Sequence, residues 1–216
     1  MRRLRGFLLR ASRNNTRTAY VLKCDIRKFF ASVDHGALVV LLQRRINDRR
    51  TVALIEEVID SFATEPCKGL PLGNLTSQLF ANVYLHELDH FVKHILREKY
   101  YARYCDDFAI VDGSRRRLEK LLRPISEFLY ARLALDIHPD KISVRTWSQG
   151  IDFLGYVLLP HCTILRTKTA RRMVVRVSHD NLSSYLGLCN HAASHKLEQL
   201  IMNKVGLGWN DSRMKS

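Results

Sequence analysis

Three aspartates are the side chains in this sequence best suited to hold a metal ion. Asp25 follows a short apolar run, and Asp106 and Asp107 are adjacent residues between two runs of β-favouring residues. Their carboxylate oxygens are hard ligands that suit Mg²⁺ better than zinc or copper. If the two segments are neighbours in one sheet, the three acids converge, and their mutual repulsion requires a cation. The residues alone leave this open, because an isolated Asp-Asp pair is commonly a solvated turn and Asp25 could be a strand-ending cap.

The segments around these acids predict a mixed α and β fold. Residues 19–24 are expected to form a buried strand, and 101–104 with 108–111 a hairpin that carries the two acids at its tip. Two further short strands are expected at 142–144 and 153–158. Apolar residues at helical spacing predict helices over 38–46, 52–62, 75–95 and 118–129, the last kinked or interrupted at Pro124, and a basic helical region from residue 167. The expected class is α+β, an antiparallel sheet with helices on one face.

The charge balance indicates a polyanionic partner. Lys and Arg total 35 against 21 Asp and Glu, which gives a net charge of +14 over 216 residues. The excess is clustered at 2–17, 115–117 and 166–176, and such clusters favour nucleic acid over a merely solubilising surface. The five cysteines are scattered without a Cys-x-x-Cys pair, so neither a disulfide framework nor a zinc ribbon is indicated. No apolar run is long enough for a membrane span, and we expect a cytoplasmic protein with no membrane partner.

Three segments resemble the palm motifs of reverse transcriptases and occur in the order of that family. They are Lys-Cys-Asp-Ile-Arg-Lys-Phe-Phe at 23–30, Leu-Gly-Asn-Leu-Thr-Ser-Gln at 72–78 and Tyr-Cys-Asp-Asp at 104–107. Phe-Leu-Gly at 153–155 resembles the primer grip, and Lys141 stands where the family usually places a lysine. The resemblance implies the palm of a right-hand polymerase and RNA-templated DNA synthesis.

The resemblance also implies a role for each matching residue. Asp25, Asp106 and Asp107 would be catalytic and would hold two Mg²⁺ ions, for which Mn²⁺ is a possible substitute, together with the backbone carbonyl of Ile26. Phe30 would be the steric gate that excludes ribonucleotides, with core packing, which is expected of Phe29, as the alternative. The other implied roles are nucleotide binding by Leu72, Gly73, Gln78 and Lys141, the primer grip by Phe153, Leu154 and Gly155, and contact with the nucleic-acid backbone by Arg166, Lys168, Arg171, Arg172 and Arg176.

The second motif departs from the common form of the family. That form reads Gln-Gly-x-x-x-Ser-Pro, whereas this chain has Leu72 for the Gln and Gln78 for the Pro. The variant, with 82–85 and 184–188, is similar to reverse transcriptases of diversity-generating retroelements, which copy RNA with adenine-directed errors. The alternatives are a reverse transcriptase of a group II intron or of a phage-defence system, and a catalytically weak fragment that binds RNA.

The resemblance predicts an unequal division of the chain. Residues 1–19 match only the end of the fingers region, 20–160 would form the palm, and 161–216 would carry the exit from the primer grip and a partial, helical thumb. The chain is therefore expected to be a shortened enzyme with truncated fingers. Its expected partners are an RNA template, a DNA or RNA primer and deoxynucleoside triphosphates, with an accessory protein as a further candidate. A zinc site at Cys189, His191 and His195 is disfavoured, because no fourth ligand is evident.

Overall fold

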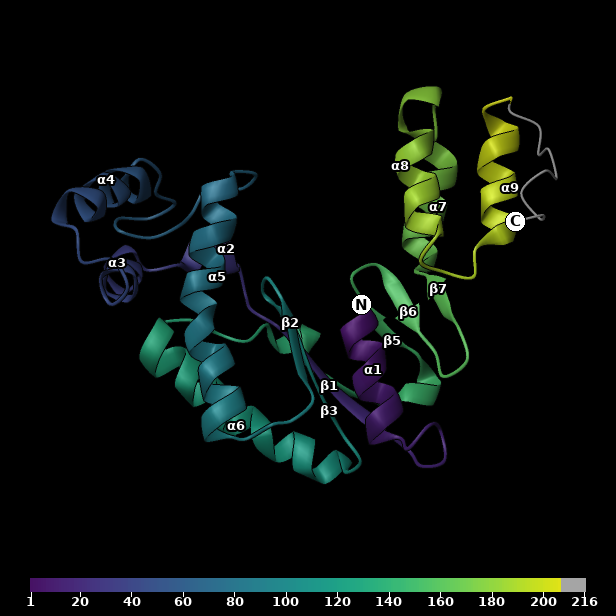
Figure 1. The fold of residues 1–216 in the computed structure, drawn as a ribbon, viewed down its shortest axis with the longest axis horizontal. Coiled ribbons are helices and arrows are strands. Elements are labelled where there is room, and N and C mark those ends of the chain that lie inside the picture. Colours follow the sequence, from purple (N-terminus) through teal and green to yellow (C-terminus); the bar gives the residue numbers. More distant parts are fainter. Residues whose placement is uncertain (207–216) are drawn as a thin grey trace. The chain divides into compact units, whose positions relative to one another are not determined.

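The computed structural model describes residues 1–206, which fold into two compact units (Figure 1). The larger unit is Gly6–Val144, and the smaller unit joins Met1–Arg5 to the segment that begins at Arg145. The boundary near residue 145 does not coincide with the functional division expected from the motifs, which remains a prediction.

A four-stranded sheet with the strand order β2-β3-β1-β4 organises the larger unit. Its strands are β1 (Tyr20–Asp25), β2 (Tyr101–Tyr104), β3 (Asp107–Asp112) and β4 (Ser143–Thr146). Strand β3 pairs antiparallel with both β1 and β2, so the expected hairpin is confirmed. All four residues from Phe108 to Val111 are buried, which places the middle of β3 inside the protein on both faces.

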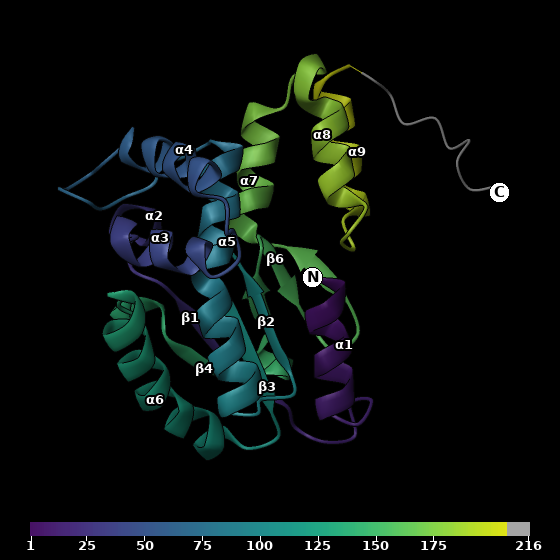
Figure 2. The ribbon, with the colours of Figure 1, turned by 60° about the vertical axis from the view of Figure 1, so that its left-hand side comes forward.

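The other elements up to residue 142 are helical. They are α1 (Arg2–Ala11), α2 (Phe29–Ser32), α3 (His35–Gln43), α4 (Arg49–Asp60), α5 (Leu75–His90) with its π-helical extension η1 (Phe91–Ile95), α6 (Arg115–Leu133) and the 3-10 turn η2 (Pro139–Lys141). Helix α6 packs on β1 and β3 and against α5, and α3 packs against α4 and α5 (Figure 2). The carboxylates of Asp34 and Asp48 cap α3 and α4 by accepting from the amides of Ala37 and Thr51, both at 2.8 Å. The expected α+β class is confirmed.

At its start, α5 does not bury the leucines whose apolar spacing contributed to the prediction of this helix. Leu75 and Leu79 are exposed, and the buried positions near the start of the helix are Ser77, Phe80 and Ala81. Apolar spacing alone cannot distinguish a leucine that packs in the core from one that is presented to a ligand.

Helix α6 runs through Pro124 without interruption. Leu118 lies before the proline and Ile125 and Leu129 after it, and all three are fully buried. Packing of this apolar face offsets the backbone hydrogen bond that the proline removes. The expected interruption is therefore wrong, whereas a kink at Pro124 stays a prediction.

The smaller unit contains a second antiparallel sheet and a group of helices. The strands are β5 (Ile151–Phe153), β6 (Tyr156–Leu158) and β7 (Thr163–Leu165), and the helices are η3 (Trp147–Gln149), α7 (Thr167–Arg176), α8 (His179–Cys189) and α9 (His195–Lys204). Helix α9 packs against both α7 and α8, as Figure 1 shows. The helical, basic character expected from residue 167 is confirmed.

Three features of the fold were not anticipated. The run 153–158 was expected to be one strand, but Leu154 (φ +55°) and Gly155 (φ +81°) form a two-residue turn that makes it a hairpin. Strand β7 was missed because it is only three residues long. Helix α1 was missed because its many arginines masked the buried face of Leu4, Phe7 and Leu8.

Within residues 1–206, no helix combines the length and the apolar character that crossing a bilayer requires.

Candidate active site

The pairing of β1 with β3 brings the predicted carboxylates to one end of the sheet. In the antiparallel register Asp25, the last residue of β1, lies directly opposite Asp107, the first residue of β3. Asp106 precedes it in the hairpin turn, and its carbonyl accepts a hydrogen bond of 3.2 Å from the amide of Ile26. The strand adjacency that the sequence could not establish is therefore present.

The turn that carries Asp106 is tight and is held from outside. Tyr104 pairs with Asp107, which leaves Cys105 and Asp106 as a two-residue turn, with Cys105 in the left-handed region (φ +51°). The partly buried Arg103 guanidinium donates to the carbonyl of Cys105 at 3.0 Å and to the two carboxylate oxygens of Asp89 on α5 at 2.8 and 2.7 Å. This bidentate pair fastens the hairpin tip to α5. Sequence reasoning did not find Arg103.

Two lysines neutralise two of the three carboxylates. Lys141 donates to Oδ1 of Asp25 at 2.7 Å, and Lys23 lies 3.0 Å from Oδ2 of Asp107. The hydrogen bond to Asp25 raises the pKa of Lys141. Lys141 was a predicted site residue, whereas Lys23 was missed. Strand alternation was the available signal, because residues two apart on β1 face the same side of the sheet.

Burial makes negative charge unfavourable in this group of acids. Burial, and then the nearby Asp25 carboxylate, raise the pKa of Asp106. Burial likewise raises the pKa of Asp107, although Lys23 opposes this shift. In the described part of the chain, Oδ1 of Asp107 is buried with no hydrogen-bond partner. An orphaned carboxylate oxygen beside two further acids fits the donor set of a hard divalent cation.

The acids are not assembled around a metal position, however. Among residues 1–206 no group of three or more His, Cys, Asp or Glu side chains is arranged so that it could hold a metal ion. The two lysine pairs supply the counter-charge instead. The chemistry of the donors thus fits Mg²⁺, while their use as a complete ligand set remains a prediction.

Phe30 follows Asp25 by five residues along the chain and is half-buried. Its ring packs on the core and meets the ring of Phe29 edge-on, with 5.2 Å between the centroids. Phe29 is buried, in agreement with its expected core position. The carbonyl of Phe30 accepts a hydrogen bond of 2.6 Å from the amide of Leu70. The first motif is therefore tied to the loop that leads into the second.

The second motif is presented to solvent at the start of α5. Leu72 is 78% exposed, and Gly73 and Gln78 are also exposed. Gly73 has a φ of +93°, and a Cβ atom built there would meet nothing within 4 Å. Glycine is thus required by the backbone conformation rather than by crowding, and the open space leaves room for a ligand to approach.

The remaining predicted residues belong to the smaller unit. Phe153 is buried, whereas Leu154 and Gly155 form the half-exposed turn of the β5–β6 hairpin. All five basic residues predicted to contact nucleic acid are exposed: Arg166, Lys168, Arg171, Arg172 and Arg176. Arg166 is partly neutralised by Asp152, at 2.5 Å.

The cysteine and histidines weighed as a zinc site do not share a helix. Cys189 is buried at the end of α8, His191 follows in the connection, and His195 begins α9.

Comparison with curated proteins places these features in a known family. The protein YkfC of Escherichia coli is 25% identical over 182 residues, which cover 67% of this chain and 48% of YkfC. The group II intron-encoded protein LtrA of Lactococcus lactis is 24% identical over 200 residues, which cover 61% of this chain and 33% of LtrA. The chain thus spans less than half the length of these two relatives.

Solved structures show the same fold at low sequence identity. A telomerase of Candida albicans in complex with a fragment of telomeric RNA aligns with a TM-score of 0.62 and 11% identity, covering 94% of this chain and 41% of that one. The apo telomerase of Candida tropicalis truncated from its C-terminal domain gives 0.59 and 14%, covering 76% and 39%. The family model described as reverse transcriptase (RNA-dependent DNA polymerase) matches residues 2–158. The chain belongs to the reverse transcriptase family.

Proposed function

We propose that this chain supplies the polymerising palm of an RNA-templated DNA polymerase that depends on Mg²⁺. The observation that carries the proposal is the register of β1 and β3, which sets Asp25 opposite Asp107 with Asp106 in the adjoining turn. The fold, the family membership and the orphaned carboxylate oxygen of Asp107 support it.

Asp25, Asp106 and the carbonyl of Ile26 would hold the metal ions, with Asp107 in the peripheral role that the resemblance to the family implies. Two bound Mg²⁺ ions would supply activation of the primer 3′ hydroxyl and neutralisation of the triphosphate. Asp25 would have to release Lys141 to take part. The freed ammonium would then be available to pair with the departing pyrophosphate, which gives Lys141 a role in either state.

The proposed substrates follow from the exposed groups. An RNA template and a DNA or RNA primer would contact the basic face of α7 through their phosphates, a contact that carries no sequence preference. Deoxynucleoside triphosphates would bind near Phe30, Leu72, Gly73 and Gln78. An accessory protein could supply further contacts to the RNA.

Primer extension on an RNA template tests the proposal. The wild-type chain should extend the primer with Mg²⁺ and not with EDTA, and Asp106→Ala should lower extension by at least about a thousandfold while leaving the fold intact. Asp140→Ala is the matched control, because Asp140 is exposed beside Lys141 and should be dispensable. A wild-type chain that binds RNA but does not extend would favour the RNA-binding fragment instead.

Within this family, the Leu72 and Gln78 variant supports an error-prone enzyme of the diversity-generating type. A leucine that is 78% exposed presents an apolar side chain where the usual glutamine could form a hydrogen bond, and so would weaken selection against a wrong base. The likeness to LtrA, an intron-encoded protein, favours a group II intron enzyme as the second candidate.

Error spectra separate these candidates. Leu72→Gln should lower misincorporation opposite template adenine by about fivefold or more, with little change opposite the other bases. Leu72→Met is the control, since it keeps an apolar side chain of similar volume. Identical spectra for all three proteins would favour the intron-type enzyme.

A further inference from the structure

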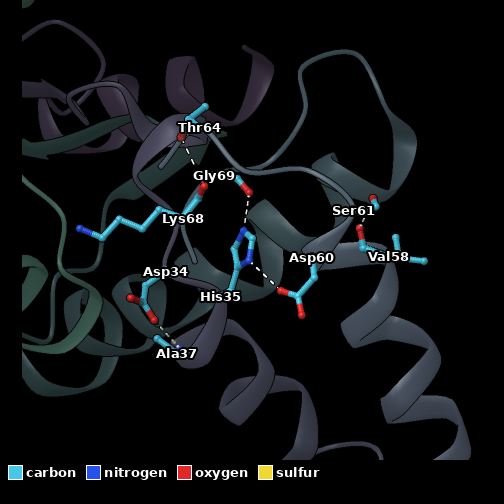
Figure 3. Close-up of polar contacts among 9 residues, drawn as sticks. All are labelled: Asp34, His35, Ala37, Val58, Asp60, Ser61, Thr64, Lys68 and Gly69. Atoms are coloured by element: carbon cyan, nitrogen blue, oxygen red, sulfur yellow. Dashed lines mark hydrogen bonds and ion pairs between the residues drawn. The ribbon is translucent and has the colours of Figure 1, made fainter. Parts of the chain in front are cut away.

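A buried histidine outside the polymerase motifs bridges two segments of the larger unit. His35, the first residue of α3, is 4% exposed. Its Nδ1 lies 3.0 Å from Oδ1 of Asp60, and its Nε2 lies 2.8 Å from the carbonyl oxygen of Gly69 (Figure 3). Neither the motifs nor the core account for a polar ring held at both nitrogens.

The two partners of the ring are both acceptors. A carboxylate and a backbone carbonyl accept hydrogen bonds, so the ring provides the N–H groups for these contacts. Asp60 is the last residue of α4, where the helix dipole disfavours an anion, and the imidazole offsets that disadvantage. The pair thus joins the end of α4 to the loop that contains Gly69.

That loop is bound along its length to the segment that follows the first motif. The amides of Leu70 and Gly69 donate to the carbonyls of Phe30 and Val33, at 2.6 and 2.8 Å. The amide of His35 donates to the carbonyl of Cys67 at 3.0 Å. The side chain of His35 adds a buried hydrogen bond to these three backbone hydrogen bonds. The loop at 67–70 therefore cannot move away from residues 30–35 without breaking hydrogen bonds.

These hydrogen bonds connect the first motif to the second motif, and both motifs contribute residues to the proposed nucleotide site. One side carries Phe30, the proposed gate, and the other side leads from Leu70 within three residues to Leu72 and Gly73. A change in the position of the loop would therefore alter the spacing between the gate and the second motif.

We propose that His35 is a positioning residue for nucleotide selection. Through its contacts with Asp60 and Gly69 it would hold the loop that precedes the second motif at a fixed distance from Phe30. The inference rests on the proposed polymerase function. His35 would not contact the substrate, and it would act through the backbone of the loop that contains Gly69.

Asp60→Ala is the decisive variant, because the Asp60 side chain is 71% exposed and its removal leaves no cavity. Glu57→Ala is the matched control, since Glu57 is an exposed acid on the same helix. We expect Asp60→Ala to raise KM for deoxynucleotides about fivefold and to lower the preference for deoxynucleotides over ribonucleotides by a similar factor. The affinity for primer and template should be unchanged in both variants.

Two substitutions of the ring itself provide the rescue test. His35→Leu removes both donors, whereas His35→Asn keeps an amide near the position of Nδ1 that can donate to Asp60. We expect the sugar preference to fall most in the leucine variant and to recover partly in the asparagine variant. A loss of stability without any change in sugar preference would show a merely structural role and would overturn the inference.

The outcome also distinguishes this inference from the proposed function. If wild type extends primers and Asp60→Ala has the kinetics of Glu57→Ala, the inference alone fails. If wild type does not extend at all, the polymerase proposal fails and the role of His35 falls with it.

Discussion

The acidic residues at the end of β1 and the start of β3 carry negative charge that the folded chain disfavours. Burial and the neighbouring Asp25 carboxylate raise the pKa of Asp106 above its usual range. The folded state therefore binds this proton more tightly than the unfolded state does, and this contribution to stability is lost as pH rises through the raised pKa. At neutral pH the ionised Asp106 is a cost that a bound cation would offset.

We predict that Asp106→Asn stabilises the metal-free chain at neutral pH. Because Asp106 is only partly buried, solvent screening limits the expected rise in Tm to about 1–3 °C in EDTA. The gain should vanish as pH falls below about 4, where the wild-type carboxyl is protonated as well. Mg²⁺ should raise the Tm of wild type and not that of the variant. Thermal unfolding across pH, with and without Mg²⁺, measures all of these effects.

Asp48→Asn provides a control of opposite sign. The side-chain hydrogen bond from Thr51 is the main cause that lowers the pKa of Asp48, so its ionised form is favoured in the folded state. That contribution is present at neutral pH and is lost on acidification. Asp48→Asn should therefore lower Tm at neutral pH. An equal response of the two variants would contradict the electrostatic account of Asp106.

At the scale of elements, the motifs predicted the strands and the hairpin that carry the acids, and the structure confirms both. Sequence reasoning could not supply the pairing of β1 with β3, because register depends on contacts between segments far apart in the chain. It missed Arg103 for the same reason, since the partners of that side chain lie on α5 and in the turn. The start of α5 shows a different limit, because Leu75 and Leu79 have the spacing of buried residues and are nevertheless exposed.

The loop that precedes the second motif depends on one glycine. Gly69 has a φ of +106°, and a Cβ atom there would lie 2.5 Å from Oγ1 of Thr64 and 3.0 Å from its backbone nitrogen. The amide of Thr64 also donates to the carbonyl of Lys68 at 2.9 Å, and this hydrogen bond holds Thr64 next to Gly69. A side chain at this position must open the loop.

We predict that Gly69→Ala lowers the free energy of unfolding by about 2–3 kcal/mol, from left-handed strain and the clash together. Gly73→Ala has similar strain, with a φ of +93°, but open space around the added atom. It should cost only about 1 kcal/mol. Urea denaturation measures both values. Equal losses would mean that the contact with Thr64 does not constrain the loop.

For the whole molecule, the net charge of +14 was evident from composition, but composition could not show which basic side chains are left without an acidic partner. Several arginines are already paired on the surface. Arg115 and Arg123 on α6 each bind a glutamate four residues later, at 2.8 and 2.7 Å. By contrast, the exposed Arg171 and Arg172 on α7 have no ion pair within the described residues. Only unpaired cations can replace the counterions of a nucleic acid at little cost.

Salt dependence of RNA binding can therefore locate the contact surface. The double variant Arg171→Ala and Arg172→Ala should make the slope of log K against log salt shallower by about 1.4–1.8, whatever the RNA sequence. The double variant Arg115→Ala and Arg123→Ala removes the same charge from pairs that glutamates already neutralise, and its slope should match that of wild type. Fluorescence anisotropy with a short RNA at several salt concentrations measures these slopes. If the two double variants lose slope equally, RNA responds to net charge alone, and the basic face of α7 is not its binding surface.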